Sequence, residues 1–187
     1  MKTYRVNLKP IFVLMLVLST SIFAQIPQPA LVGYWENWNS LKLTDLHENY
    51  NVIQLAFAVT TGESMYEMEF NLPYHYTEAT FKADIETLHS EGKKVILSIG
   101  GANDPVFLGS DSERDTFVED ISAILSRFDY LIDGIDFDFA GKTTSFNFND
   151  NWTMTSPAPG QIRMIQAVEA IMANYAQATS KHLLLTM

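Results

Sequence analysis

The sequence contains no cysteine among its 187 residues. This absence excludes disulfide bonds, thiol nucleophiles, thiolate metal sites and the cysteine that a lipoprotein leader requires. The fold must therefore be held together by packing. A hydrophobic content of 47% is sufficient for one ordinary globular core.

Positive charge is also scarce. Twelve lysines and arginines stand against 22 aspartates and glutamates, a formal net charge of −10. The sequence has no basic stripe, and an acidic protein repels both nucleic acid and anionic membranes. We therefore expect no nucleic-acid partner, whereas a neutral polysaccharide meets no electrostatic barrier.

The longest apolar run lies near the N-terminus. Lys2, Arg5 and Lys9 are followed by the apolar run from Ile11 to Leu18 and by the small residue Ala24. This order is typical of a secretory signal peptide, and the run is shorter than the roughly 20 residues of a membrane-spanning helix. A buried strand and an uncleaved anchor are the alternatives. Cleavage leaves nine basic and 22 acidic residues, a net charge of −13. We predict a signal peptide over residues 1–24, an extracellular or periplasmic location, and no membrane contact after cleavage.

Histidine is too sparse to indicate a metal site. The four histidines are far apart and show no ligand spacing. We expect no metal and no other cofactor, and the sequence gives no indication of the oligomeric state.

In residues 25–187, short apolar runs alternate with longer stretches of helical periodicity. The predicted strands are Leu31–Trp38, Asn51–Val59, Lys94–Gly101, Leu131–Phe139 and a last one that begins near His182. The predicted helices are Thr77–Ser90, Ser112–Phe128 and one from Pro159 or Gly160 to about Ala178. In the last helix the apolar residues expected to face the core are Ile162, Ile165, Val168, Ile171 and Met172. This alternation predicts βαβ units and a parallel sheet, with reactive groups at the carboxyl ends of the strands.

The fourth predicted strand carries several acidic residues, in Asp133-Gly134-Ile135-Asp136-Phe137-Asp138-Phe139-Ala140. Side chains alternate along a strand, so Asp136, Asp138 and position 140 share one face, which in a barrel is the interior. Neighbouring carboxylates cannot all ionise at low cost, and their pKa values therefore separate. The pattern favours a proton-handling site. A cation site or a hydrogen-bonded structural cluster is the alternative.

This strand resembles that of glycoside hydrolase family 18, the chitinases and their relatives, whose pattern is Asp-Gly-x-Asp-x-Asp-x-Glu. Ala140 is the one departure from it. A second resemblance is Ser98-Ile99-Gly100-Gly101 at the end of the third strand. Weaker agreement lies in Gly33-Tyr34-Trp35, Ile53–Phe57 and Leu184–Met187. The resemblance covers Leu31 to Met187.

This resemblance implies a (β/α)8 TIM barrel of roughly 250 residues. Residues 25–187 are expected to supply a partial domain truncated at its C-terminal end, with strands 1 to 4 and the start of strand 5.

The resemblance also implies an activity. The family hydrolyses β-1,4-N-acetylglucosamine linkages by a substrate-assisted retaining mechanism, in which the acetamido oxygen of the substrate attacks. Asp138 is then expected to orient the acetamido group and Asp136 to pair with Asp138, while the proton donor belongs at Ala140. The expected substrate-binding residues are Tyr34, Phe57, Ser98, Gly100, Gly101 and Met187. The expected partners are chitin or N-acetylglucosamine oligosaccharides. Because Ala140 has no proton to give, we expect strongly impaired hydrolysis.

Several aromatic residues are further candidates for stacking on sugar rings. Tyr34, Trp35, Trp38 and Phe57 lie near strand ends, and about half of such residues are expected to be core. Phe148 and Trp152 belong to the long predicted loop Gly141–Pro157. Three hypotheses stay open: a chitinase fragment with a substituted acid, a non-catalytic chitin-binding relative, and an endo-β-N-acetylglucosaminidase.

Overall fold

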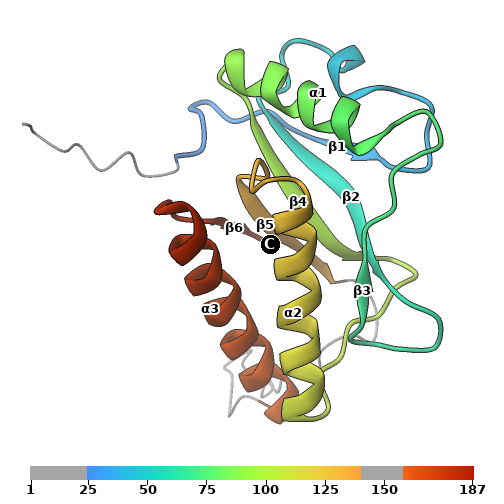
Figure 1. Ribbon diagram of the computed structural model, residues 1–187, viewed down its shortest axis with the longest axis vertical. Coiled ribbons are helices and arrows are strands. Elements are labelled where there is room, and N and C mark those ends of the chain that lie inside the picture. Colours follow the sequence, from blue (N-terminus) through green and yellow to red (C-terminus); the bar gives the residue numbers. More distant parts are fainter. Residues whose placement is uncertain (1–24, 140–157) are drawn as a thin grey trace, which may run out of the picture.

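The computed structural model describes residues 25–139 and 158–187. Its centre is a sheet of six strands, β1 (Val32–Glu36), β2 (Val52–Thr60), β3 (Met68–Glu69), β4 (Lys94–Gly101), β5 (Gly134–Phe139) and β6 (Leu184–Thr186). Five of the strands are parallel in the order β1-β2-β4-β5-β6, and β3 pairs antiparallel with β2. The strand order follows the chain order. This sequential order of parallel strands is the order found in a (β/α) barrel (Figure 1).

The helices connect consecutive parallel strands. They are α1 (Glu78–Ser90), α2 (Asp111–Arg127) and α3 (Pro159–Thr179), and a short 3-10 helix, η1, spans Leu43–Asp45. Thr77 caps α1 and Ser110 caps α2, each accepting a hydrogen bond from the backbone N–H three residues later. The three helices agree with the predicted ones to within one residue at each end. Among the described residues, no helix is long and apolar enough to span a membrane.

The bounds of β5 differ from the prediction. The strand begins at Gly134 and not at Leu131, and it follows a turn in which Asp129 and Tyr130 have positive φ angles of 53° and 56°. Two elements were not predicted, η1 and β3. They span three and two residues, which is too short for a periodic pattern to be recognised.

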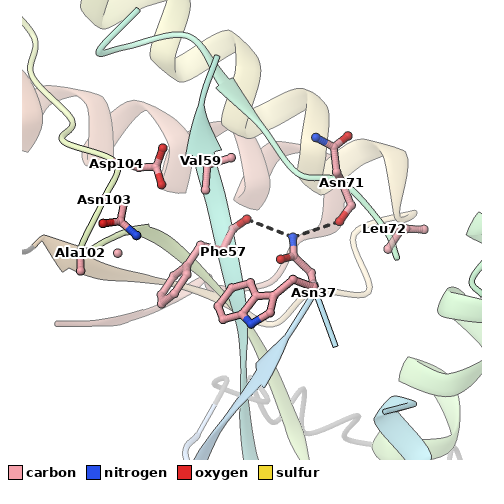
Figure 2. Close-up of a pocket in the computed structure, with 10 residues that line it drawn as sticks. Asn37, Phe57, Val59, Asn71, Leu72, Ala102, Asn103 and Asp104 are labelled. Atoms are coloured by element: carbon pink, nitrogen blue, oxygen red, sulfur yellow. Dashed lines mark hydrogen bonds between the residues drawn. The ribbon is translucent and has the colours of Figure 1, made fainter. Parts of the chain in front are cut away.

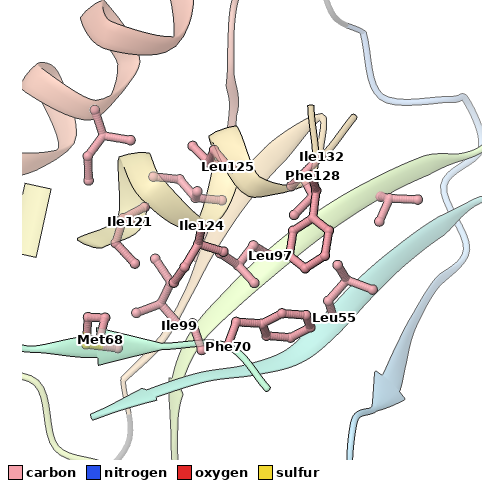
Figure 3. Packing of buried hydrophobic residues seen from close by; sticks show 14 of the residues in the cluster. Leu55, Met68, Phe70, Leu97, Ile99, Ile121, Ile124, Leu125, Phe128 and Ile132 are labelled. Atoms are coloured by element: carbon pink, nitrogen blue, oxygen red, sulfur yellow. The ribbon is translucent and has the colours of Figure 1, made fainter. Parts of the chain in front are cut away.

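The main hydrophobic core lies between the sheet and its helices. Leu55, Leu97, Ile99 and Ile135 point from the strands toward the helices and are fully buried. Figure 3 shows several of these side chains against those of α2 and the residues after it, among them Ile121, Ile124, Leu125, Phe128 and Ile132. Each fully buried aliphatic or aromatic side chain stabilises the fold by about 1.5–3 kcal/mol relative to an exposed one. This core fixes the sheet that presents the site.

One expectation about α3 was wrong. Ile162 and Ile165 are 42% and 57% exposed, although their spacing predicted that they face the core. The buried face of α3 is instead formed by Gly160, Gln161, Met164, Ala167, Ile171 and Tyr175. Periodicity identified the apolar side of the helix but not how much of that side α2 and the sheet cover. Ile165 lines an apolar groove of about 510 Å³ between α3 and the β5–β6 edge.

Candidate active site

Asp136 is the best-fixed acidic side chain on the inner face of the sheet. It is 2% exposed, and its two carboxylate oxygens accept different hydrogen bonds. Ser98 Oγ donates to Oδ2 at 2.7 Å, and Thr186 Oγ1 donates to Oδ1 at 2.6 Å. Ser98, Asp136 and Thr186 are directly opposite one another in the β4–β5–β6 register. Because two donors satisfy both oxygens, the buried carboxylate is held in one orientation.

Asp138 lies two residues farther along β5, on the same face, and is half-buried. Tyr34 faces the two carboxylates from β1, and its hydroxyl interacts with Ser98 and Asp136. Burial raises the pKa of Tyr34, and the charges of Asp136 and Asp138 raise it further. Tyr34 is therefore a neutral phenol at physiological pH and a hydrogen-bond donor beside the carboxylates. Ala140 lies outside the described residues.

Gly100 and Gly101 allow β4 to end close to its neighbours. Their φ angles are +103° and +91°, a region that favours glycine. A Cβ at Gly100 would lie 2.9 Å from the carbonyl oxygen of Asp138, and one at Gly101 would lie 3.1 Å from the ring of Phe57. The glycine pair thus brings the end of β4 against both Asp138 and an aromatic ring at the carboxyl edge of the sheet.

The candidate aromatic residues divide between core and site. Trp35 is 1% exposed and donates its indole N–H to the Leu41 carbonyl at 2.8 Å, so it belongs to the core. Trp38 is 64% exposed and stacks on Phe57, with ring centroids 6.0 Å apart and an interplanar angle of 23°. Trp38 and Phe57 together form an aromatic surface at the ends of β1 and β2. Apolar ring faces of this kind can pack against the C–H face of a sugar.

A cavity of about 640 Å³ opens beside this aromatic surface (Figure 2). It is lined by Asn37, Trp38, Phe57, Val59, Asn71, Leu72, Gly101, Ala102, Asn103 and Asp104. Aromatic rings and side-chain amides are therefore combined in one open cavity at the carboxyl ends of β1, β2 and β4. Such a lining suits a ligand with apolar ring faces and peripheral hydroxyl or amide groups.

Sequence reasoning missed the polar residues of this cavity. The position of Asn37, next to Trp38 at a strand end, was the available signal for the first of them. Asn71 had none, because it follows the two-residue strand β3. Asn103 and Asp104 follow the glycine pair, and the rule that loops after parallel strands carry function could have selected them.

The predicted site residues are not all brought together. Tyr34, Ser98 and Gly100 adjoin the carboxylates, whereas Phe57 and Gly101 line the cavity. Met187 is 96% exposed and lines the apolar groove beside α3 rather than the cavity. Phe148 and Trp152 lie outside the described residues. In residues 25–139 and 158–187, no group of three or more histidine and acidic side chains is arranged to hold a metal ion.

Residues 30–187 match the profile of Glycosyl hydrolases family 18. Chitinase Chi52 of Paenibacillus xylanexedens is 33% identical over 149 residues, covering 78% of this chain and 28% of that protein. Exochitinase 1 of Streptomyces olivaceoviridis is 35% identical over 163 residues, covering 81% of this chain and 27% of that protein. The chain thus spans little more than a quarter of the length of these two relatives.

The structure also resembles that of a member of this family. The crystal structure of a family GH18 chitinase from Chromobacterium violaceum superposes with a TM-score of 0.69 and 28% sequence identity. The match covers 87% of this chain and 41% of that one. Together with the parallel strand order, this confirms the predicted fold class, a partial (β/α) barrel of the chitinase type.

Proposed function

The chain belongs to family 18 of the glycosyl hydrolases, and we propose that its inner sheet face and cavity bind N-acetylglucosamine oligosaccharides of the chitin type. The ligand extends along the carboxyl ends of the strands, from Asp138 toward the Trp38–Phe57 surface. Chitin is uncharged, so the net charge of −10 does not oppose binding.

The orientation of Asp136 is the observation that carries this proposal. Burying a carboxylate is costly unless its oxygens are paired, and Ser98 and Thr186 pair both of them. The oriented carboxyl group of Asp136 lies two residues before Asp138 on the same strand and beside the hydroxyl of Tyr34. This arrangement supports a role for Asp138 in accepting a hydrogen bond from the acetamido N–H of the sugar.

In the proposed reaction, the acetamido oxygen attacks the anomeric carbon, the glycosidic C–O bond breaks and the leaving sugar oxygen takes up a proton; water then hydrolyses the cyclic intermediate. Asp138 orients the acetamido group, and Tyr34 supplies a neutral donor beside it. The proton belongs to an acid at position 140, where this chain has Ala140. General acid catalysis contributes about 10²- to 10⁴-fold to rate. We therefore propose a protein that retains oligosaccharide but hydrolyses it very slowly.

The sharpest test of the missing acid compares Ala140→Glu with Ala140→Gln in the complete protein. Glutamine has nearly the size of glutamate but cannot act as the acid, so it controls for filling the space. Turnover of a fluorogenic N-acetylglucosamine oligomer should rise by about 10²-fold or more with glutamate only. Equal rates for the two variants would show that position 140 does not limit the reaction.

We also infer export of the protein, on the basis of the basic and apolar residues within 1–24. Mass spectrometry of the protein recovered from its natural host tests this. A mature N-terminus near residue 25 is expected, whereas an intact Met1 in the cell extract would contradict export.

A further inference from the structure

Asn37 connects three segments at the edge of the cavity. It follows β1, and its backbone N–H donates to the Ala56 carbonyl of β2 at 2.8 Å. Its side-chain nitrogen donates to the Asn71 carbonyl at 3.0 Å and to the Phe57 carbonyl at 3.4 Å (Figure 2). Both acceptors are backbone carbonyls, and the bond to Asn71 is the shorter of the two. The contact therefore requires a side chain with a hydrogen-bond donor, which an amide has and a carboxylate lacks.

The segment that contains Asn71 has little strand pairing of its own. β3 pairs with β2 at two residues, and side chains satisfy neighbouring backbone groups. From α2, Asp120 accepts from the Met68 N–H at 2.9 Å and Arg127 donates to the Phe70 carbonyl at 2.9 Å. Those two links lie on the helix side. Asn37 supplies the link on the cavity side.

The same residue is adjacent to the aromatic surface. Asn37 precedes Trp38 in the chain and bonds to the carbonyl of Phe57, the two residues whose rings stack. It thereby joins the aromatic surface to the cavity wall formed by Asn71 and Leu72. Loss of the side-chain donors would leave that wall without its bond to the aromatic side.

We propose that Asn37 is a positioning residue for the saccharide cavity: by donating to the carbonyls of Phe57 and Asn71, it sets the distance between the aromatic surface and the 71–72 wall. This inference rests on the proposed function, and it assigns to Asn37 part of the affinity for oligosaccharide. It requires no contact between Asn37 itself and the sugar.

The matched pair Asn37→Asp and Asn39→Asp tests the proposal in the full chain. The first substitution keeps the shape of the side chain but removes both donors and places a carboxylate against two carbonyls. Asn39 accepts from the Ser40 N–H at 2.7 Å, a bond that a carboxylate also makes, and it does not line the cavity. Both variants add one negative charge in the same loop, so general electrostatic effects cancel in the comparison.

Isothermal titration with the N-acetylglucosamine hexamer is the measurement. We expect Asn39→Asp to bind within about twofold of the unmodified chain, and Asn37→Asp to bind at least about tenfold more weakly. Equal affinities of the two variants would overturn the proposal. If Asn37→Asp fails to fold, Asn37→Ala and Asn39→Ala replace the pair, with the same expected order and the same contrary result.

A destabilised variant at the other end of the sheet distinguishes a positioning role of Asn37 from a general effect on stability. Asp133 lies at the start of β5, away from the cavity, and Asp133→Asn should lower stability without weakening hexamer binding. If it weakens binding as much as the Asn37 variant does, the loss is one of general stability and the proposal fails.

Oligosaccharide binding and the role of Asn37 can be tested independently. If the unmodified chain binds no hexamer, hydrogen–deuterium exchange of residues 68–72 still decides the role of Asn37 in holding the wall. Faster exchange in the Asn37 variant than in its Asn39 control supports that role, and equal exchange refutes it.

Discussion

Ser98 and Asp136 face each other across the β4–β5 pair, joined by a hydrogen bond of 2.7 Å from Ser98 Oγ to Asp136 Oδ2. The contact links the two sequence motifs that carry the family resemblance. It shows why a hydroxyl residue stands at position 98. A carboxylate that is 2% exposed needs a donor from the neighbouring strand.

We expect Ser98→Ala to leave one buried oxygen of Asp136 without this donor. The free energy of unfolding should fall by about 1–3 kcal/mol, measured by chemical denaturation. Ser122→Ala is the control, because Ser122 lies on α2 and its Oγ accepts an exposed hydrogen bond of 3.3 Å from Asn174 Nδ2. A loss no larger than that of the control would mean that Asp136 is satisfied in another way.

Removing the exposed indole should weaken binding of oligosaccharide. Trp38→Ala deletes the larger ring of the aromatic surface, and the apolar area that a sugar face buries there contributes about 25 cal/mol per Å². We expect about a tenfold loss of affinity for the N-acetylglucosamine hexamer by titration calorimetry. Tyr74→Ala removes a ring that is 94% exposed and outside the cavity, and it should bind as the unmodified chain does. Equal affinity of the Trp38 and Tyr74 variants would place the sugar elsewhere.

Gly101→Ala and Gly92→Ala separate backbone strain from steric conflict. Both glycines have positive φ angles, +91° and +77°. A Cβ at Gly92 meets nothing within 4 Å, whereas one at Gly101 meets the ring of Phe57 at 3.1 Å. Gly92→Ala should lose about 1 kcal/mol of stability, and Gly101→Ala should lose more and also weaken hexamer binding, because its Cβ displaces Phe57. Unchanged binding by Gly101→Ala would show that the ring position is unimportant.

Asp133 anchors the opposite end of the sheet. It accepts from His89 Nε2 at 2.8 Å, Lys94 Nζ at 2.9 Å and the Val95 N–H at 2.9 Å. Burial alone raises the pKa of Asp133, but these donors outweigh burial and leave the pKa below its ordinary value. A lowered folded-state pKa stabilises the protein above the unfolded pKa of about 3.9, and this stabilisation is lost as pH falls through the folded value.

We therefore expect Asp133→Asn to cost about 2 kcal/mol at pH 7 and to flatten the decline of stability below about pH 4. Denaturation across a pH series measures both effects. The control is Asp129→Asn, which removes a surface pair between Lys82 and a carboxylate whose side chain is 71% exposed, and it should cost less than about 1 kcal/mol. If stability declines as steeply below pH 4 in Asp133→Asn as in the unmodified chain, other groups cause the pH dependence.

The parallel strands and the carboxylate face could be predicted from the sequence because they depend on local, repeating patterns. Alternation along β5 placed Asp136 on the face opposite Ile135, as the structure has it. The glycine pair was recognised by resemblance, while its physical reason, the close approach of Asp138 and Phe57, became visible only in three dimensions.

The cavity wall and the exposure of α3 could not be predicted in the same way. The hydrogen bond from Asn37 to Asn71 joins residues 34 positions apart in the sequence. Asn71 follows the two-residue strand β3, which is too short to give a periodic pattern that would predict the contact. Ile165 was predicted as core because its spacing is helical, yet coverage depends on which neighbours pack beside the helix. Tertiary contacts decided both cases.

Binding without hydrolysis is tested most directly by titration of the N-acetylglucosamine hexamer into the unmodified chain, followed by chromatography of the sugar recovered from the same sample. We predict saturable binding and recovery of intact hexamer, because the cavity and carboxylates remain while Ala140 cannot protonate the leaving oxygen. Absence of saturable binding, or release of shorter oligomers, would contradict it.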